Sequence, residues 1–368
     1  LMLTSYNLAA GRIRRDEETG RPYIKCNDSG VRVLEGSCEI TMEEALGFEE
    51  VEVEGVHERR VSMGGTRVEC LVHDGVLGPD IGFSPLVYVQ FTRFKCGGLA
   101  IGVNWAHVLG DPISASSFIN TWAQVLEGQK PPETLHTPSP WTRLTLSDSK
   151  TPTYLKQVEP RGDHWLPTSS PKMKSHSFRL TPKQLSTLSS GTFHKDQNGT
   201  HYFQALSALV WKSVSKTRGD SGPNAITICT ILTQGRDLEI PCNKLTFSTV
   251  QAKNSPAEMG LNELAILIGE NQQEESSSVG KEVEEDVDYV AYGTRLTFVD
   301  MEGADIYGLE VKGHRPVFVD YRIGGVGDEG AVVLLPGPGG AGRTLAVTLP
   351  EDQLVELVHE LHRELGIA

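Results

Sequence analysis

The sequence predicts an α/β protein built from two domains. Strand-like and helix-like segments alternate in both halves of the chain, which favours α/β over all-β. The length of 368 residues is about twice that of an ordinary domain. Eight of the 20 prolines fall between Pro131 and Pro171, in a stretch rich in Thr and Ser that has no sustained periodicity. We therefore expect domains at residues 1–127 and 172–368, joined by a surface crossover over 128–171.

Composition excludes several classes of protein. A hydrophobic content of 38% with 22% charged residues is typical of a globular chain that buries a substantial core. The formal net charge of −14 argues against nucleic acid as a partner and against a polybasic grip on anionic lipid. No apolar run approaches the roughly 18 residues of a membrane-spanning helix. The first residue is Leu1, so we expect a preceding N-terminal segment to be missing.

The cysteines give no sign of a disulfide framework or of a zinc site. Their scattered positions, without a C-x-x-C pair, are typical of reduced cytosolic thiols, and they are Cys26, Cys38, Cys70, Cys96, Cys229 and Cys242. We expect no bound metal and no bound cofactor.

In the first half, a β-hairpin and a helix are predicted in succession. Residues Leu86–Phe94 and Leu99–Trp105 are rich in β-branched and aromatic residues and flank a Cys-Gly-Gly turn. A helix should follow from Pro112 to about Glu127, with Asp111 at its N-cap position and proline in its first turn. The apolar residues of this helix recur at helical spacing and should form one buried face: Ala115, Phe118, Ile119, Trp122, Val125 and Leu126.

The second half alternates in the same way. Thr181-Pro182-Lys183-Gln184 is a capping box, and a stronger amphipathic helix is expected over Tyr202–Lys216. Ala331–Leu335 and Thr344–Leu349 should be strands around a Gly/Pro loop, followed by a final helix over Pro350–Leu365. Between these parts, residues 270–288 carry eight acids and one lysine, a pattern typical of a solvated loop or of a docking surface for a basic partner.

Two motifs contain the residue types of known signatures, but their spacing or the elements around them differ from those that the signatures require. Residues 325–330 spell G-x-G-x-x-G, yet an apolar strand follows where a dinucleotide site requires a helix, so we expect a tight turn. His359 and His362 lie three residues apart, whereas zinc proteases space their histidines four apart, and a solvated helix flank is the expected role. The chain has no G-x-S-x-G, so a hydrolase-type serine nucleophile has no support.

His107 is the candidate for proton-transfer chemistry. It lies two residues beyond Trp105, where a strand ends, and a neutral imidazole there could accept a proton from an alcohol or an amine. The alternative is a purely structural role, in which His107 is a hydrogen-bonded histidine beside a strand end. Asp111, four residues on, could orient the imidazole, or it could cap the next helix and brace the loop through an arginine. Its position favours the cap, and we expect His107 at the junction between the domains.

The H-x-x-x-D pattern between a strand and an amphipathic helix resembles the BAHD family of plant acyl-CoA-dependent acyltransferases. Three further segments resemble family motifs: Tyr6–Ile13 (YNLAAGRI), Tyr23–Gly30 (YIKCNDSG) and Phe203–Lys212 (FQALSALVWK). The resemblance implies two domains of chloramphenicol-acetyltransferase-like fold with mixed sheets. It also implies a solvent channel between the domains, with His107 at its middle as the general base of an acyltransferase.

The chain also departs from the family pattern. Pro112 follows Asp111 where the family has glycine, and of the D-F-G-W-G motif residues 305–309 keep only Asp305, as a structural residue. The family's D-x-R and Y-F-G-N segments are unrecognisable between Thr230 and Thr249. These segments shape the channel and the domain interface in ordinary members, so their loss puts ordinary acyl transfer in doubt.

A narrower resemblance covers three long stretches. Residues Arg21–Glu35, Val76–Asp111 and Tyr292–Val311 resemble the Eceriferum-two and Glossy-two group of plant cuticular wax synthesis. That resemblance implies an accessory protein of the endoplasmic-reticulum fatty-acid elongase. It would act with a 3-ketoacyl-CoA synthase, the condensing enzyme, to extend very-long-chain acyl-CoA, and the histidine is not always required in that group.

The alternative is an acyl-CoA-dependent O- or N-acyltransferase with His107 as general base and acyl-CoA as substrate. With neither a spanning segment nor a basic face, the chain should reach the cytosolic face of the endoplasmic reticulum through its partner and otherwise be cytoplasmic.

Overall fold

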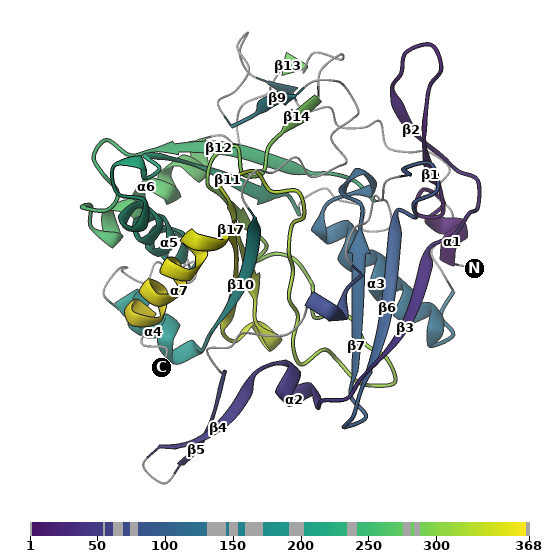
Figure 1. Ribbon diagram of the computed structural model, residues 1–368, viewed down its shortest axis with the longest axis horizontal. Coiled ribbons are helices and arrows are strands. Elements are labelled where there is room, and N and C mark those ends of the chain that lie inside the picture. Colours follow the sequence, from purple (N-terminus) through teal and green to yellow (C-terminus); the bar gives the residue numbers. More distant parts are fainter. Residues whose placement is uncertain are drawn as a thin grey trace.

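The computed structural model contains two sheet-centred halves that lie side by side (Figure 1). It describes residues 2–53, 56–61, 69–73, 80–130, 145–146, 154–158, 172–190, 202–233, 241–274, 281–282 and 288–365. Most of the expected crossover over 128–171, part of the acidic segment over 270–288 and all of residues 234–240 lie outside these residues.

A six-stranded mixed sheet organises the second half. Its strands follow the order β10-β17-β16-β15-β11-β12. The two central pairings, β15 with β16 and β15 with β11, are parallel, and the outer pairings are antiparallel. The strands are β10 (Met173–Leu180), β11 (Ala225–Ile231), β12 (Leu245–Gln251), β15 (Thr297–Asp300), β16 (Ala331–Pro336) and β17 (Arg343–Pro350).

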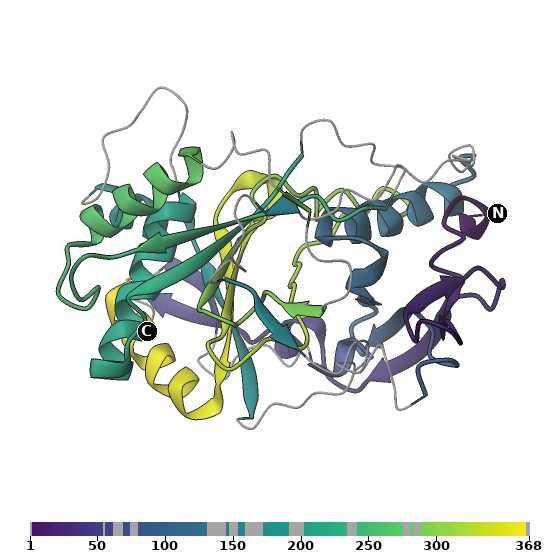
Figure 2. The same cartoon turned by 90° about the horizontal axis from the view of Figure 1, so that it is seen from above.

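Helices cover one face of this sheet, and Figure 2 shows them on the side away from the first half. They are α4 (Pro182–Ser190), α5 (Tyr202–Arg218), α6 (Leu261–Glu274) and α7 (Glu351–Leu365). The central helix α5 is buried along most of its length, and Trp211 is fully buried in it. The indole N–H of Trp211 donates to the carbonyl of Pro223, as a buried indole requires. This layer forms the main hydrophobic core.

The other face of the sheet is turned toward the first half. Because side chains alternate along a strand, Ile228 of β11 packs under the helices while its neighbour Cys229 packs on the opposite face. Ile113, at the start of helix α3 in the first half, joins the same cluster as Cys229. This second cluster is therefore continuous across the two halves.

A three-stranded sheet, β3-β6-β7, and helix α3 (Pro112–Leu126) form the centre of the first half. The strands are β3 (Arg32–Cys38), β6 (Val87–Phe94) and β7 (Leu99–Trp105), with β6 and β7 antiparallel and β3 parallel to β6. Phe118 of α3 is buried, with its ring 5.1 Å from that of Tyr6 and 5.3 Å from that of Trp105. Helix α3 thus packs through its middle onto this core.

Shorter elements surround these layers. They are α1 (Met2–Ser5), β1 (Arg12–Arg15), β2 (Pro22–Lys25), α2 (Met42–Ala45), β4 (Phe48–Val53), β5 (Val56–Val61), β8 (Thr145–Leu146), β9 (Lys156–Val158), β13 (Lys281–Glu282) and β14 (Asp288–Val290). Strands β8 and β9 belong to the expected crossover and pair with β13 and β14 of the second half. The described parts of the crossover are therefore tied to the second half by strand pairing.

Most of the expected local elements are confirmed within a residue or two. The hairpin, α3, the capping box at Thr181 and Gln184, α5, the two late strands and α7 are all present. The expected buried face of α3 is partly wrong. Phe118 is buried as expected, but Leu126 is 58% exposed, and the other buried residues are Pro112, Ile113, Ser114 and Ala123. The first turn of α3 is buried because the second half packs on it, which helical periodicity does not encode.

Candidate functional site

His107 lies where the two halves meet. Strand β7 ends at Trp105, and His107 opens a short 3-10 turn that leads to α3. Its Nε2 is 3.0 Å from the hydroxyl of Tyr292, and its carbonyl accepts a hydrogen bond of 3.0 Å from the side-chain amide of Asn243. Both partners belong to the second half, and the imidazole is half-buried. His107 therefore has the position that its place at a strand end led us to expect.

Asp111 is fully buried at the N-cap of α3. Its Oδ1 accepts from the backbone N–H of Ser114 at 3.2 Å, which satisfies one of the free donors of the first helical turn. Its Oδ2 accepts from the backbone N–H of Lys244 at 2.9 Å. The carboxylate thus serves as the expected helix cap and also as a bond to the second half. Bracing through an arginine stays a prediction.

A short segment of the second half, residues 242–244, docks on the loop that carries the motif. The backbone N–H of Asp111 donates to the carbonyl of Cys242 at 3.1 Å. The hydroxyl of Ser114 lies 3.0 Å from both the carbonyl and the N–H of Cys242. Cys242 and Lys244 make these contacts through their backbone groups, 128 or more residues away in the chain, so their residue types do not signal this role. Asn243 contributes its side-chain amide, which donates to the carbonyl of His107.

Tyr292 is the residue of the site that sequence reasoning missed. It precedes Gly293, and the backbone N–H of Gly327 donates to its carbonyl at 3.0 Å. A Cβ at Gly327 would lie 2.7 Å from the carbonyl oxygen of Gly293, so these two segments of the chain approach this closely only because residue 327 is glycine. The G-x-G-x-x-G letters therefore form the expected tight turn, which leads into β16, and this turn holds Tyr292 in place.

The surroundings of the Tyr292 hydroxyl are apolar and buried. Cys229, fully buried on β11, has its Sγ 4.0 Å from this hydroxyl. The centre of the Phe247 ring lies 5.9 Å from the centre of the Tyr292 ring, edge on. Burial raises the pKa of the Cys229 thiol to about 12 and raises the pKa of Tyr292 above its usual value. Both groups therefore keep their protons at neutral pH, and Cys229 is not an activated nucleophile.

Asp305 lies apart from this cluster. It is exposed, in the turn after β15, and its carbonyl accepts a hydrogen bond of 3.3 Å from the side chain of Asn120 on α3. A little further on, the backbone N–H of Lys312 donates to the side chain of Glu127. The segment over 305–312 thus contacts the second half of α3 and its C-cap through backbone groups.

The histidines of the last helix are not both solvated, so that expectation is wrong for one of them. His359 is exposed, but His362 is only 9% exposed and packs edge on against Phe178 at 5.7 Å. The reason is that α7 lies flat on β10 and β17, so its buried stripe is wider than the leucines indicate. Within the described part of the chain, no three His, Cys, Asp or Glu side chains are grouped as metal ligands would be.

Two pockets in the described residues lie away from His107. One, of about 310 Å³, is lined by apolar side chains of α1, β3, β6 and α3, including Val33 and Trp122. The other, of about 520 Å³, is polar and lies near Arg218 and Glu329. The channel expected between the domains stays a prediction.

The fold and the site define a class of protein, and comparison with known sequences names it. The Transferase family, to which the BAHD acyltransferases belong, matches residues 1–364, so the chain belongs to that family. Vinorine synthase, whose crystal structure is known, superposes with a TM-score of 0.65 over 96% of this chain and 80% of its own, at 18% identity. F. sporotrichioides TRI101, solved with coenzyme A and T-2, gives a TM-score of 0.58 over 97% of this chain and 86% of its own, at 16% identity. These likenesses confirm the two-domain α/β fold with mixed sheets.

The particular relatives are Eceriferum proteins of Arabidopsis thaliana. Protein ECERIFERUM 26-like is 40% identical over 358 residues, which are 96% of this chain and 79% of that protein. Protein ECERIFERUM 2 is 36% identical over 371 residues, 98% of this chain and 83% of that protein. Rosmarinate synthase of Plectranthus scutellarioides is 31% identical over 57% of this chain and 46% of its own length. The likeness to the Eceriferum proteins thus covers nearly the whole of this chain and about four fifths of theirs.

Proposed function

We propose that this protein is an accessory protein of the fatty-acid elongase of the endoplasmic reticulum. It would act with a 3-ketoacyl-CoA synthase to extend very-long-chain acyl-CoA for cuticular wax. The observation that carries the proposal is the likeness, over nearly the whole of this chain, to ECERIFERUM 2 and ECERIFERUM 26-like, at 36% and 40% identity. Likeness to a transferase such as rosmarinate synthase covers 57% of the chain.

The geometry of the motif supports the same proposal. Both Asp111 oxygens accept backbone N–H groups, and the imidazole of His107 and its carbonyl are bonded to Tyr292 and Asn243 of the second half. These contacts hold the two halves together, which an accessory protein needs as much as an enzyme does. The motif is therefore accounted for without a proton-transfer step.

The second candidate is an acyl-CoA-dependent acyltransferase, which the retained His107 and Asp111 favour. The imidazole would take the proton of an alcohol or amine as its oxygen or nitrogen attacks the thioester carbonyl directly. The carbon–sulfur bond would then break, and coenzyme A would leave as a thiol with that proton. No covalent enzyme intermediate is involved.

Chain elongation by the His107→Ala protein separates the two candidates. Wild type and variant are each expressed with a plant 3-ketoacyl-CoA synthase in a host lacking waxes, and acyl-chain lengths are profiled. We expect lengthened chains from both, because the alanine removes the base and its hydrogen bond to Tyr292 but leaves the contacts that the backbone of residue 107 and the side chain of Asp111 make with the second half. Loss of a general base typically lowers a transferase rate by about 10²–10⁴-fold. His359→Ala, at an exposed position on α7, is the matched control. A His107→Ala protein that accumulates normally yet gives no lengthened chains would make this an enzyme.

Localisation is proposed to depend on the partner. In the described part of the chain, no helix is long and apolar enough to cross a membrane. We expect recruitment to the cytosolic face of the endoplasmic reticulum by the condensing enzyme. Fractionation should find the protein with membranes when the synthase is co-expressed and in the supernatant without it. Pelleting with membranes in the absence of the synthase would contradict this proposal.

A further inference from the structure

The hydroxyl of Tyr292 fills the hydrogen-bonding position at Nε2 of His107. The two atoms are 3.0 Å apart, within ordinary hydrogen-bond range, and the two rings lie 5.6 Å apart with a tilt of 39°. Nitrogen lone pairs are the basic sites of an imidazole, so a donor at Nε2 uses the pair that would otherwise accept a proton from a substrate. Tyr292 therefore bears directly on whether His107 can be a base.

The direction of this hydrogen bond follows from the protons available. Burial raises the pKa of Tyr292, so its hydroxyl keeps its proton. That proton can be donated either to Nε2 of His107 at 3.0 Å or to the sulfur of Cys229 at 4.0 Å. A ring nitrogen is the stronger acceptor and is the nearer one, which favours the tautomer with its proton on Nδ1 and donation from the hydroxyl to Nε2. In the other tautomer Nε2 carries the proton and donates to the hydroxyl, so this nitrogen is occupied in either case.

Tyr292 is held in this position from three sides. Its carbonyl accepts from Gly327 at 3.0 Å, its ring packs edge on against Phe247, and its hydroxyl faces Cys229. The close approach of Gly293 and Gly327 restricts the backbone directly after Tyr292. Rotation of the side chain away from His107 would have to displace these buried neighbours.

We infer that Tyr292 is a positioning residue that masks the base nitrogen of His107 and makes this histidine a contact between the two halves. This inference rests on the proposed function, because an accessory protein can keep the histidine while giving up its free lone pair. It also accounts for the presence of His107 and Asp111 in a protein that does not use this pair for acyl transfer.

Chemical labelling of the histidines tests directly whether the lone pair on Nε2 of His107 is available to react. Diethyl pyrocarbonate transfers its ethoxycarbonyl group to a free imidazole lone pair, and peptide mass spectrometry measures the rate at each histidine. In the wild-type protein, we expect His107 to react several-fold more slowly than His359, which is exposed on α7. Equal rates at the two positions would overturn the inference without any variant.

Tyr292→Phe then isolates the hydroxyl. It keeps the ring and its packing, and the rate at His107 should rise about five-fold, the equivalent of about 1 kcal/mol for one hydrogen bond. Tyr321→Phe is the matched control. Tyr321 packs against the same hydrophobic cluster as Tyr292, and this variant removes a hydroxyl other than the one that lies 3.0 Å from Nε2. An unchanged rate at His107 in Tyr292→Phe, or an equal rise in the control, would refute the inference that the Tyr292 hydroxyl blocks Nε2 of His107.

The labelling result and the elongation result fail independently. Faster labelling of His107 in Tyr292→Phe, together with no elongation by the wild type, would support the inference that Tyr292 blocks Nε2 of His107 and would refute the accessory function. Elongation by the wild type with no change in labelling would do the reverse. Thermal unfolding of Tyr292→Phe confirms that the variant is folded before either comparison.

Discussion

Replacing Asp111 by alanine removes two backbone contacts at once. Ser114 loses the acceptor that caps the first turn of α3, and Lys244 loses the acceptor that ties its N–H to the first half. Loss of an N-cap costs about 0.5–2 kcal/mol. A donor left unsatisfied in a buried position costs about 1–3 kcal/mol. Because the carboxylate is fully buried, little water can compensate, and we expect the free energy of unfolding to fall by about 2–4 kcal/mol.

Urea unfolding followed by circular dichroism measures this change. The midpoint should shift while the slope of the transition stays the same, because the variant changes stability and not the surface exposed. Asp111→Asn keeps an oxygen for one of the two N–H groups and should lose about half as much. Asp305→Ala, at the exposed aspartate of the other family motif, should change the free energy by less than about 0.5 kcal/mol. An Asp111→Ala protein as stable as wild type would refute the structural role assigned to this carboxylate.

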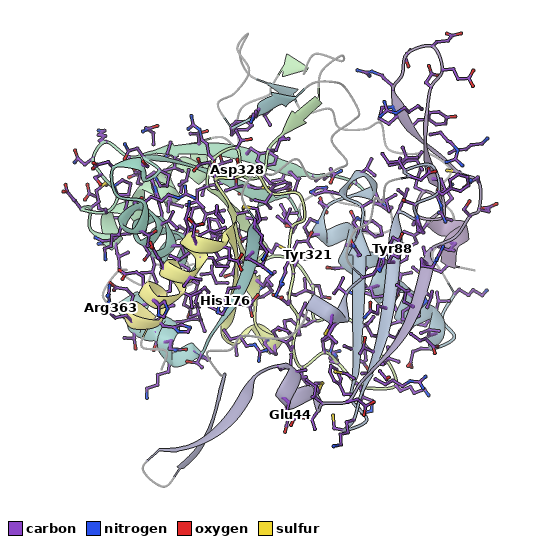
Figure 3. All side chains as sticks on the ribbon, in the orientation of Figure 1. Glu44, Tyr88, His176, Tyr321, Asp328 and Arg363 are labelled. Atoms are coloured by element: carbon purple, nitrogen blue, oxygen red, sulfur yellow. The ribbon has the colours of Figure 1, made fainter. Side chains whose placement is uncertain are left out.

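Two further predictions concern packing and pH. Gly327→Ala should destabilise by about 1–3 kcal/mol, because its Cβ would lie 2.7 Å from the carbonyl of Gly293. Thermal unfolding measures this loss, and Gly324→Ala, whose Cβ meets nothing within 4 Å, should leave the stability nearly unchanged in the same experiment. His176, which is labelled in Figure 3, lies on β10, and its burial and then the neighbouring His362 lower its pKa from 6.5 to about 4. The folded state thus binds fewer protons, so His176 contributes its full stability above about pH 6.5 and loses up to about 3 kcal/mol as the pH falls toward 4. Unfolding measured across this range should show a smaller loss in His176→Leu, and an identical loss in both proteins would contradict the assignment.

The sequence by itself determined the local elements and the place of the motif. Helical periodicity and end signals located α5, α7 and the capping box at Thr181, because these depend on residues within a few positions of one another. Asp111 was identifiable as an N-cap for the same reason, since the cap and the N–H that it accepts are three residues apart. The position of His107 at a strand end followed from the hairpin before it.

Only the tertiary structure decided what these residues contact. Tyr292 is 185 residues from His107, and no spacing rule links a hydroxyl to an imidazole over that distance. Cys242 and Lys244 bind through backbone groups, which their residue types do not reveal, and the amide of Asn243 binds a carbonyl 136 residues away. His362 is buried because α7 lies flat on the sheet, and the sheet order that places it there joins strands from opposite ends of the second half. Periodicity records which face of an element is apolar, whereas the choice of partner depends on how distant layers pack, and that choice determines whether His107 is a base or a contact.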